Sequence, residues 1–204
     1  DQDFRLLLEN ALPVSKILED TYHLEGRQVL LFVGRLIDIK NLFFLLDALA
    51  LVVNRYPKVI LLFVGDGDQR VALERHAERN GLADHVIFAG KKQGEDLYAC
   101  YNVGQIFILP SYYERFGAVV NEALLAGCYT LCSVVAGAAC LIEPQKNGDL
   151  FDPASKTYLA EKLAQSLKDC EGLKQISLKA NKMCYSYDQY ITSFFNQLNS
   201  IIDK

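Results

Sequence analysis

Short apolar runs recur along the chain, and most of them end in glycine or proline. They are QVLLFVG (28–34), VILLFVGDG (59–67), HVIFAG (85–90), QIFILPS (105–111) and YTLCSVV (129–135). Strands that are buried on both faces of a parallel sheet are apolar at successive positions and do not alternate with polar residues. The runs therefore predict buried parallel strands.

Helical patterns fill the intervals between these runs. They cover residues 41–56, stopped by Pro57, 69–80, capped by Gly81, 95–102, and 119–126, capped by Gly127. A short last strand at Leu150 and Phe151 and a helix over 155–167 extend the series. Strands that alternate with helices imply right-handed crossovers. The pattern predicts the α/β class with an open, doubly wound parallel sheet.

The two ends of the chain fit this alternation less well. Residues 1–26 contain no strand of their own, so we expect a linker with a helical stretch around 4–10. The apolar residues between 187 and 202 repeat with a helical period and predict an amphipathic helix. That helix either covers the core or presents its apolar face to a partner domain. The main domain is expected to cover residues 27–204.

Composition narrows the class of protein. A chain of 204 residues with 51% hydrophobic residues and 5 prolines is suited to one compact domain. Its 21 basic and 25 acidic residues give a net charge of -4, which offers no footprint for nucleic acid or an anionic membrane. The longest apolar stretch, about twelve residues within 42–53, is shorter than the ~20 that a transmembrane helix needs. The chain opens on Asp-Gln-Asp without a signal-peptide pattern, so we expect a cytoplasmic location.

The cysteines do not predict a metal site. They stand at positions 100, 128, 132, 140, 170 and 184, without CxxC spacing and without a nearby histidine pair. This spacing favours neither zinc nor a disulfide framework. We expect buried, reduced thiols and no metal ion.

Polar residues and glycines follow the predicted strands, where ligands of doubly wound sheets bind. Arg35 and Lys40 follow the first strand, and a guanidinium with an ammonium suits a diphosphate. The same two residues also fit the role of ordinary surface cations. Gly90, after the third strand, lets a flat base approach the backbone, and the Gly-Asp-Gly turn at 65–67 is a weak signal by itself.

The stretch ERFGAVVNEALLAG (114–127) has two carboxylates on either side of an apolar run. Eight helical residues separate Glu114 from Glu122 by roughly 12 Å, too far for a paired acid and base that cleaves a glycoside. Gly117 stands where a loop meets a helix start, and free amides there suit a phosphate. Glu122 then reaches back to a diol such as a ribose, and Glu114 faces whatever lies beyond the phosphates. Alternatively, Glu114 is a solvated loop acid and Glu122 a capping residue.

Taken in order, these motifs resemble the C-terminal, donor-binding domain of retaining GT-B glycosyltransferases of family 4, the glycosyl transferases group 1. The resemblance rests on GRLIDIKN (34–41), VGDG (64–67), VIFAGK (86–91), ILPS (108–111) and the E-x7-E motif from 114 to 122. It implies a Rossmann-like domain that is one half of the GT-B fold.

The resemblance also implies roles for individual residues. Arg35 and Lys40 would bind the donor diphosphate, and Glu122 would bind the ribose. The donor sugar hydroxyls would be held by Glu114 together with backbone amides near Phe116, Gly117 and Ala118. Glu114, Arg35 and Lys40 are then the expected catalytic residues. Where the family often has Gly-Gly-x-x-Glu, this chain has AGAAC (136–140), with Cys140 in place of the acid, and this departure weakens the assignment of that segment to the site.

The activity that the resemblance implies is transfer of a hexosyl group from a nucleotide sugar to a saccharide or lipid-linked acceptor, with retention and without a metal cofactor. The acceptor site of such enzymes lies mostly on an N-terminal half, so this chain alone is expected to be inactive. The missing half or the acceptor would bring the enzyme to the membrane periphery. Two alternatives remain open, half of a nucleotide-sugar 2-epimerase and a non-catalytic nucleotide-sugar-binding module.

Overall fold

A six-stranded parallel sheet forms the centre of the protein. The computed structural model describes residues 2–170 and residue 182. The strand order is β3-β2-β1-β4-β5-β6, so the direction of winding reverses between β1 and β4. The strands are β1 (Gln28–Val33), β2 (Val59–Val64), β3 (Val86–Gly90), β4 (Ile106–Leu109), β5 (Tyr129–Ser133) and β6 (Gly148–Phe151). The predicted doubly wound parallel sheet is confirmed.

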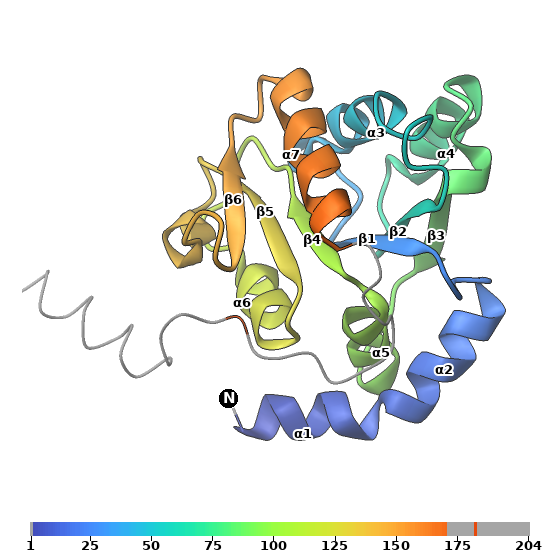
Figure 1. Ribbon diagram of the computed structural model, residues 1–204, viewed down its shortest axis with the longest axis vertical. Coiled ribbons are helices and arrows are strands. Elements are labelled where there is room, and N and C mark those ends of the chain that lie inside the picture. The colour runs from blue at the N-terminus through green and yellow to red at the C-terminus, as the bar shows by residue number, and fades with distance from the viewer. Residues whose placement is uncertain (1, 171–181, 183–204) are drawn as a thin grey trace, which may run out of the picture.

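Helices cover both faces of the sheet, which gives three layers (Figure 1). One face carries α3 (Leu42–Ala50), α4 (Arg70–Arg79) and α7 (Lys156–Asp169). The other carries α1 (Gln2–Asn10), α2 (Leu12–Thr21), α5 (Glu95–Val103) and α6 (Ala118–Leu125). Successive strand residues alternate between the two layers, so Leu30 and Phe32 pack under α3 while Leu31 and Val33 pack against the opposite cluster. Both faces are buried, which explains why the strands read as continuous apolar runs.

The helical stretch predicted around residues 4–10 is confirmed, but the N-terminal segment packs on the domain and is not a free linker. It forms α1 and α2, and Leu8, Ala11 and Leu18 are buried in the core. The side-chain amide of Asn102 on α5 donates to the Leu8 carbonyl at 2.9 Å and to the Ser15 hydroxyl at 3.0 Å. These contacts join the first 21 residues to the body of the domain.

Element boundaries differ from the predictions mainly where glycine and proline follow a strand. β2 ends at Val64 and β4 at Leu109, because the residues after them turn away into the loops at the carboxyl edge. The helix predicted over 41–56 ends at residue 50 and continues as turns to residue 55. The predicted amphipathic helix between 187 and 202 lies outside the described residues.

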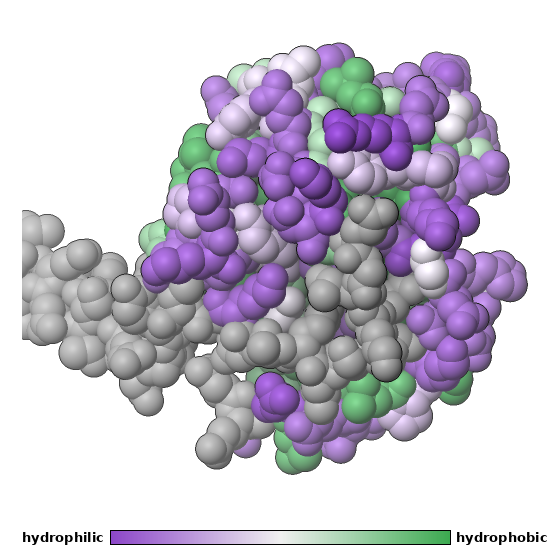
Figure 2. All heavy atoms as spheres, viewed as in Figure 1, coloured by the Kyte–Doolittle hydropathy of each residue, from purple (hydrophilic) through white to green (hydrophobic). Residues whose placement is uncertain are grey.

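The surface in Figure 2 is mostly hydrophilic, with hydrophobic side chains along α1 at the bottom of the view. Leu6 and Leu7 are exposed there, as is Ile17 on α2. Within residues 2–170 and at residue 182, no helix is both long and apolar enough to cross a bilayer. Four of the five described cysteines are buried, as expected, whereas Cys140 is exposed.

Candidate functional site

The loops that follow β1 and β4 meet through an ion pair. Lys40 ends a short 3-10 turn after β1, and Glu114 lies in the loop between β4 and α6. The Lys40 ammonium donates a hydrogen bond to the Glu114 carboxylate, and the side chains are only 15% and 16% exposed. Two of the residues singled out in the sequence are therefore brought into direct contact.

The segment after β5 packs against the same loop. The Gly137 amide donates to the Glu114 carbonyl at 3.0 Å, and Glu114 also forms an isolated bridge with Ala136. A β-carbon on Gly137 would lie 2.1 Å from the Arg115 carbonyl oxygen, so no larger residue fits there. The AGAAC segment (136–140) departs from the family pattern, which weakened its assignment to the site. It nevertheless supports the backbone of the Glu114 loop.

The start of α6 lies beside this pair. Gly117, its N-cap residue, has a left-handed backbone with φ +81°, which residues with a side chain rarely adopt. Within the described part of the chain, no side chain caps this helix. The first amide groups of α6 and the positive end of its dipole are therefore available to an anion. Phe116 is 80% exposed and Ala118 is exposed, so the approach from solvent is open.

Glu122 lies about one turn further along α6 and is half-buried. The Tyr101 hydroxyl on α5 donates a hydrogen bond to its Oε2 atom at 2.6 Å. Burial and the neighbouring Glu122 carboxylate raise the pKa of Tyr101 well above its usual value. Tyr101 therefore remains a protonated donor. Sequence reasoning missed this tyrosine, because it stands among core residues of a helix.

Arg35 and Gly90 lie at the same edge of the sheet. Arg35 lies two residues after the end of β1 and is exposed, and none of the described residues forms a hydrogen bond or ion pair with its side chain. Gly90 ends β3, and no atom of the described residues lies within 4 Å of the position that its β-carbon would take. Three strand spacings separate β3 from β4 in the sheet, roughly 14 Å. A ligand that contacts both Gly90 and Glu114 must be long and extended.

Exposed aromatic and aliphatic side chains surround this edge, and of these only Phe116 was singled out from the sequence, for its backbone amide. They are Tyr112, Tyr113, Phe116, Val134 and Val135. The Tyr112 hydroxyl donates to the Asp38 carboxylate, and the Arg115 guanidinium donates to the Tyr113 hydroxyl at 2.9 Å. The first contact joins the loop after β1 to the loop after β4, and the second lies within the loop after β4.

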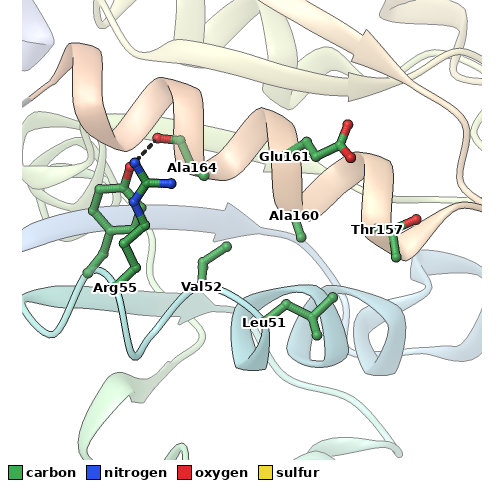
Figure 3. A pocket seen from close by; sticks show the side chains of 8 residues that line it. Leu51, Val52, Arg55, Thr157, Ala160, Glu161 and Ala164 are labelled. Atoms are coloured by element: carbon green, nitrogen blue, oxygen red, sulfur yellow. Dashed lines mark hydrogen bonds between the residues drawn. The ribbon is translucent and has the colours of Figure 1, made fainter.

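An open hollow of about 260 Å³ lies elsewhere, between the turns after α3 and helix α7 (Figure 3). Its lining is formed by Leu51, Val52, Arg55, Tyr56, Thr157, Ala160, Glu161 and Ala164. None of the residues singled out from the sequence lines it. The candidate site is therefore the carboxyl edge of the sheet, where the cations, the carboxylates and the free helix start converge. Among the described residues, no three His, Cys, Asp or Glu side chains gather to hold a metal ion.

Comparison with known proteins identifies the family. A family model described as Glycosyl transferases group 1 matches residues 15–183, which is most of the chain. The chain belongs to this family. The match begins inside α2, in agreement with the packing of that helix against the core.

Relatives of this glycosyltransferase domain are considerably longer than the chain. It is 30% identical over 161 residues to an uncharacterized glycosyltransferase of Methanocaldococcus jannaschii, covering 79% of this chain and 41% of the relative. It is 28% identical over 190 residues to a sulfoquinovosyl transferase of Arabidopsis thaliana, covering 92% of this chain and 33% of the relative. The chain therefore spans about two fifths or less of the curated relatives it matches.

Solved structures agree on the fold. Anabaena HepE, crystallised with UDP, superposes with a TM-score of 0.74 at 24% identity, over 93% of this chain and 52% of HepE. The C-terminal domain of a group 1 glycosyl transferase from Francisella tularensis gives a TM-score of 0.67 at 22% identity, over 82% of this chain and 86% of that domain. The glycosyltransferase domain thus has the Rossmann-like fold that forms one half of the GT-B architecture.

Proposed function

We propose that this chain is the donor-binding domain of a retaining glycosyltransferase and binds a nucleotide sugar at the carboxyl edge of its sheet. The observation that carries the proposal is the Lys40–Glu114 pair beside the uncapped start of α6. A cation, a carboxylate and free amide groups come together there from segments 74 residues apart. Membership of the glycosyl transferases group 1 supports the reaction class.

Each part of the donor has a proposed partner. The diphosphate lies between Arg35, Lys40 and the first amides of α6, because these groups carry positive charge or its partial equivalent. Glu122 accepts hydrogen bonds from the ribose, and the open backbone at Gly90 faces the base. Glu114 then binds hydroxyls of the donor sugar, with the backbone amides around Phe116, Gly117 and Ala118.

The chemistry follows from where charge develops. As the bond between the sugar and the diphosphate breaks, negative charge grows on the leaving phosphate oxygens. Arg35, Lys40 and the α6 amides are donors that stabilise this charge, which lowers the barrier, and of these the backbone amides of α6 are held in place by the helix. We propose that the acceptor attacks the same face of the sugar, which gives retention. Arg35 and Lys40 supply the positive charge that a divalent ion supplies in other transferases, so no metal is required.

Transfer to an acceptor is favoured over the alternatives. The relatives quoted above are named as transferases, and neither the family description nor those names refers to an epimerase. Because the relatives are considerably longer than this chain, we propose that the acceptor site lies on a further domain. The chain alone then binds the donor without transferring its sugar. The expected cytoplasmic location, with peripheral membrane association through that domain or the acceptor, stays a prediction.

Thermal unfolding in the presence of nucleotides tests the proposal. UDP, GDP and ADP and their hexose conjugates are each added to the chain, with and without EDTA. A ligand at a hundred times its dissociation constant stabilises the folded state by about 2.7 kcal/mol, which raises the melting temperature measurably. We expect at least one nucleotide series to stabilise the chain, and EDTA to change nothing. No stabilisation by any series, or stabilisation that requires a divalent ion, contradicts the proposal.

A further inference from the structure

We propose that Tyr101 is a positioning residue that fixes the Glu122 carboxylate in the orientation needed to bind the ribose. The inference rests on the proposed function, and it begins from the hydrogen bond of 2.6 Å between the Tyr101 hydroxyl and Glu122 Oε2. This bond joins α5 to α6, so the orientation of a proposed ligand-binding side chain depends on a residue outside the E-x7-E motif.

The Tyr101 side chain is itself held firmly. It is fully buried, and its ring lies 6.5 Å from that of Phe4 on α1 and 6.4 Å from that of Phe107 on β4. The neighbouring Asn102 is bonded to the Leu8 carbonyl and to Ser15, which anchors the same stretch of α5 to α1 and α2. A tyrosine packed between a helix and a strand has little rotational freedom, so the position of its hydroxyl is fixed.

A fixed donor on one carboxylate oxygen leaves the rest of the group for a ligand. An ionised carboxylate has two oxygens with about four acceptor sites, and Tyr101 uses one of those on Oε2. Oε1 and the remaining site on Oε2 can accept from the two hydroxyls of a ribose diol. Without the tyrosine hydroxyl, Glu122 would sample other rotamers, and binding would have to order it again.

If Tyr101 only anchored α5 to α6, its loss would weaken all nucleotides equally. A measurement that depends on the ribose hydroxyls therefore separates a positioning role from an anchoring role. Isothermal titration would use whichever of UDP, GDP or ADP binds the wild-type chain most tightly, together with its 2′,3′-dideoxy analogue. A lost hydrogen bond to a charged group weakens binding by about tenfold or more, so the wild-type chain should discriminate against the analogue by at least that factor. This result also tests the proposed ribose role of Glu122.

The deciding variant is Tyr101→Phe, which keeps the ring and removes only the hydroxyl. We expect it to weaken the ribonucleotide about three- to tenfold and to leave the dideoxy analogue nearly unchanged, so that the discrimination falls. Tyr56→Phe is the matched control, because it removes a hydroxyl that donates to the Ala164 carbonyl at 2.8 Å, away from the site. It should change neither affinity.

Two outcomes overturn the inference. In the first, the wild-type chain binds the ribonucleotide more tightly than the dideoxy analogue, and Tyr101→Phe either keeps this difference in full or weakens both ligands equally. Either result indicates that Tyr101 is only a structural anchor. The second comes from the double variant. In a chain that already carries Glu122→Gln, Tyr101→Phe should cost no further ribonucleotide affinity, so additive losses from the two substitutions would contradict a positioning role. A wild-type chain that binds neither ligand contradicts the proposed function instead. Thermal melts of each variant establish that it is folded before titration.

Discussion

The Lys40 ammonium lies against the Glu114 carboxylate although the two residues are 74 positions apart in the chain. They meet because β1 and β4 are neighbours in the sheet, so the loops at their carboxyl ends share one edge. Both side chains are largely buried, at 15% and 16% exposed. In this ion pair each side chain neutralises the charge of the other. A bound diphosphate would compete with Glu114 for Lys40, which links the proposed phosphate and sugar subsites.

Substitution of Lys40→Met should weaken binding of a nucleoside diphosphate by about ten- to a hundredfold, because a charge-assisted contact is lost. Arg35→Met should act in the same direction. Binding of the corresponding nucleoside, which carries no phosphate, should change little in either variant. Calorimetric titration of both ligands measures the difference.

Lys58→Met is the matched control for this experiment. Lys58 is an exposed cation immediately before β2, at the opposite edge of the sheet, so its loss should leave both affinities unchanged. Equal losses for the nucleoside and the diphosphate in Lys40→Met would argue against a phosphate role. So would a comparable loss in Lys58→Met.

Gly117→Ala should destabilise the domain more than Gly81→Ala. Both glycines have a left-handed backbone, with φ +81° and +70°, so each substitution incurs strain of about 1–2 kcal/mol. A β-carbon at Gly81 meets nothing within 4 Å, whereas one at Gly117 lies 3.0 Å from Ala138 Cβ and 3.2 Å from Leu109 Cδ2. We expect a further 1–3 kcal/mol of overpacking at Gly117, at the order-of-magnitude level. Urea unfolding gives both values, and equal costs would contradict the packing of the α6 start.

The cysteines should differ sharply in reactivity. Burial raises the pKa of the Cys100 and Cys132 thiols to about 12, because it disfavours the charged thiolate. At pH 8 only about one thiol in ten thousand is then ionised, and the thiolate is the nucleophile. Cys140 is exposed, so iodoacetamide should label it in the native protein, whereas Cys100 and Cys132 should react only after unfolding.

Peptide mass mapping with localisation of each labelled cysteine follows this reaction, and Cys140→Ser serves as the control. The variant should lose the label assigned to position 140 and retain the pattern at Cys100 and Cys132. Rapid labelling of Cys100 in the folded protein would contradict the burial of α5 against the sheet.

Much of the fold could be predicted from the sequence, because strands buried on both faces have continuous apolar runs, and the glycines and prolines that end these short runs distinguish them from buried helices. Strands β2 and β4 were predicted too long, because the predicted runs included the Gly-Asp-Gly turn (65–67) and the Pro-Ser pair (110–111) that follow them, where the chain leaves the sheet. The N-terminal helices were missed in part. Phe4, Leu8, Ala11 and Leu18 have helical spacing, but their role depends on packing against α5, which no local pattern reveals.

The roles of the candidate site residues stay predictions, whereas several contacts among them could not be predicted from the sequence. Lys40 and Glu114 were assigned to different parts of a ligand, and their mutual contact depends on the strand order. Tyr101 is a buried core residue, so its position in the sequence does not set it apart from its neighbours. Only its hydroxyl contacts Glu122. The close fit of Gly137 against the Arg115 carbonyl depends on tertiary contact between two loops.

The most direct test of the account is titration of the wild-type chain, Glu114→Ala and Glu122→Ala with a nucleoside diphosphate and with its sugar conjugate. Glu122→Ala should weaken both ligands by about ten- to a hundredfold, since both carry the ribose. Glu114→Ala should leave the bare diphosphate nearly as tightly bound and weaken only the sugar conjugate, by a similar factor. If both variants lose the two ligands in the same proportion, the division of the donor between Glu114 and Glu122 is wrong, and the stretch from 114 to 127 serves only to hold the loop and α6 in place.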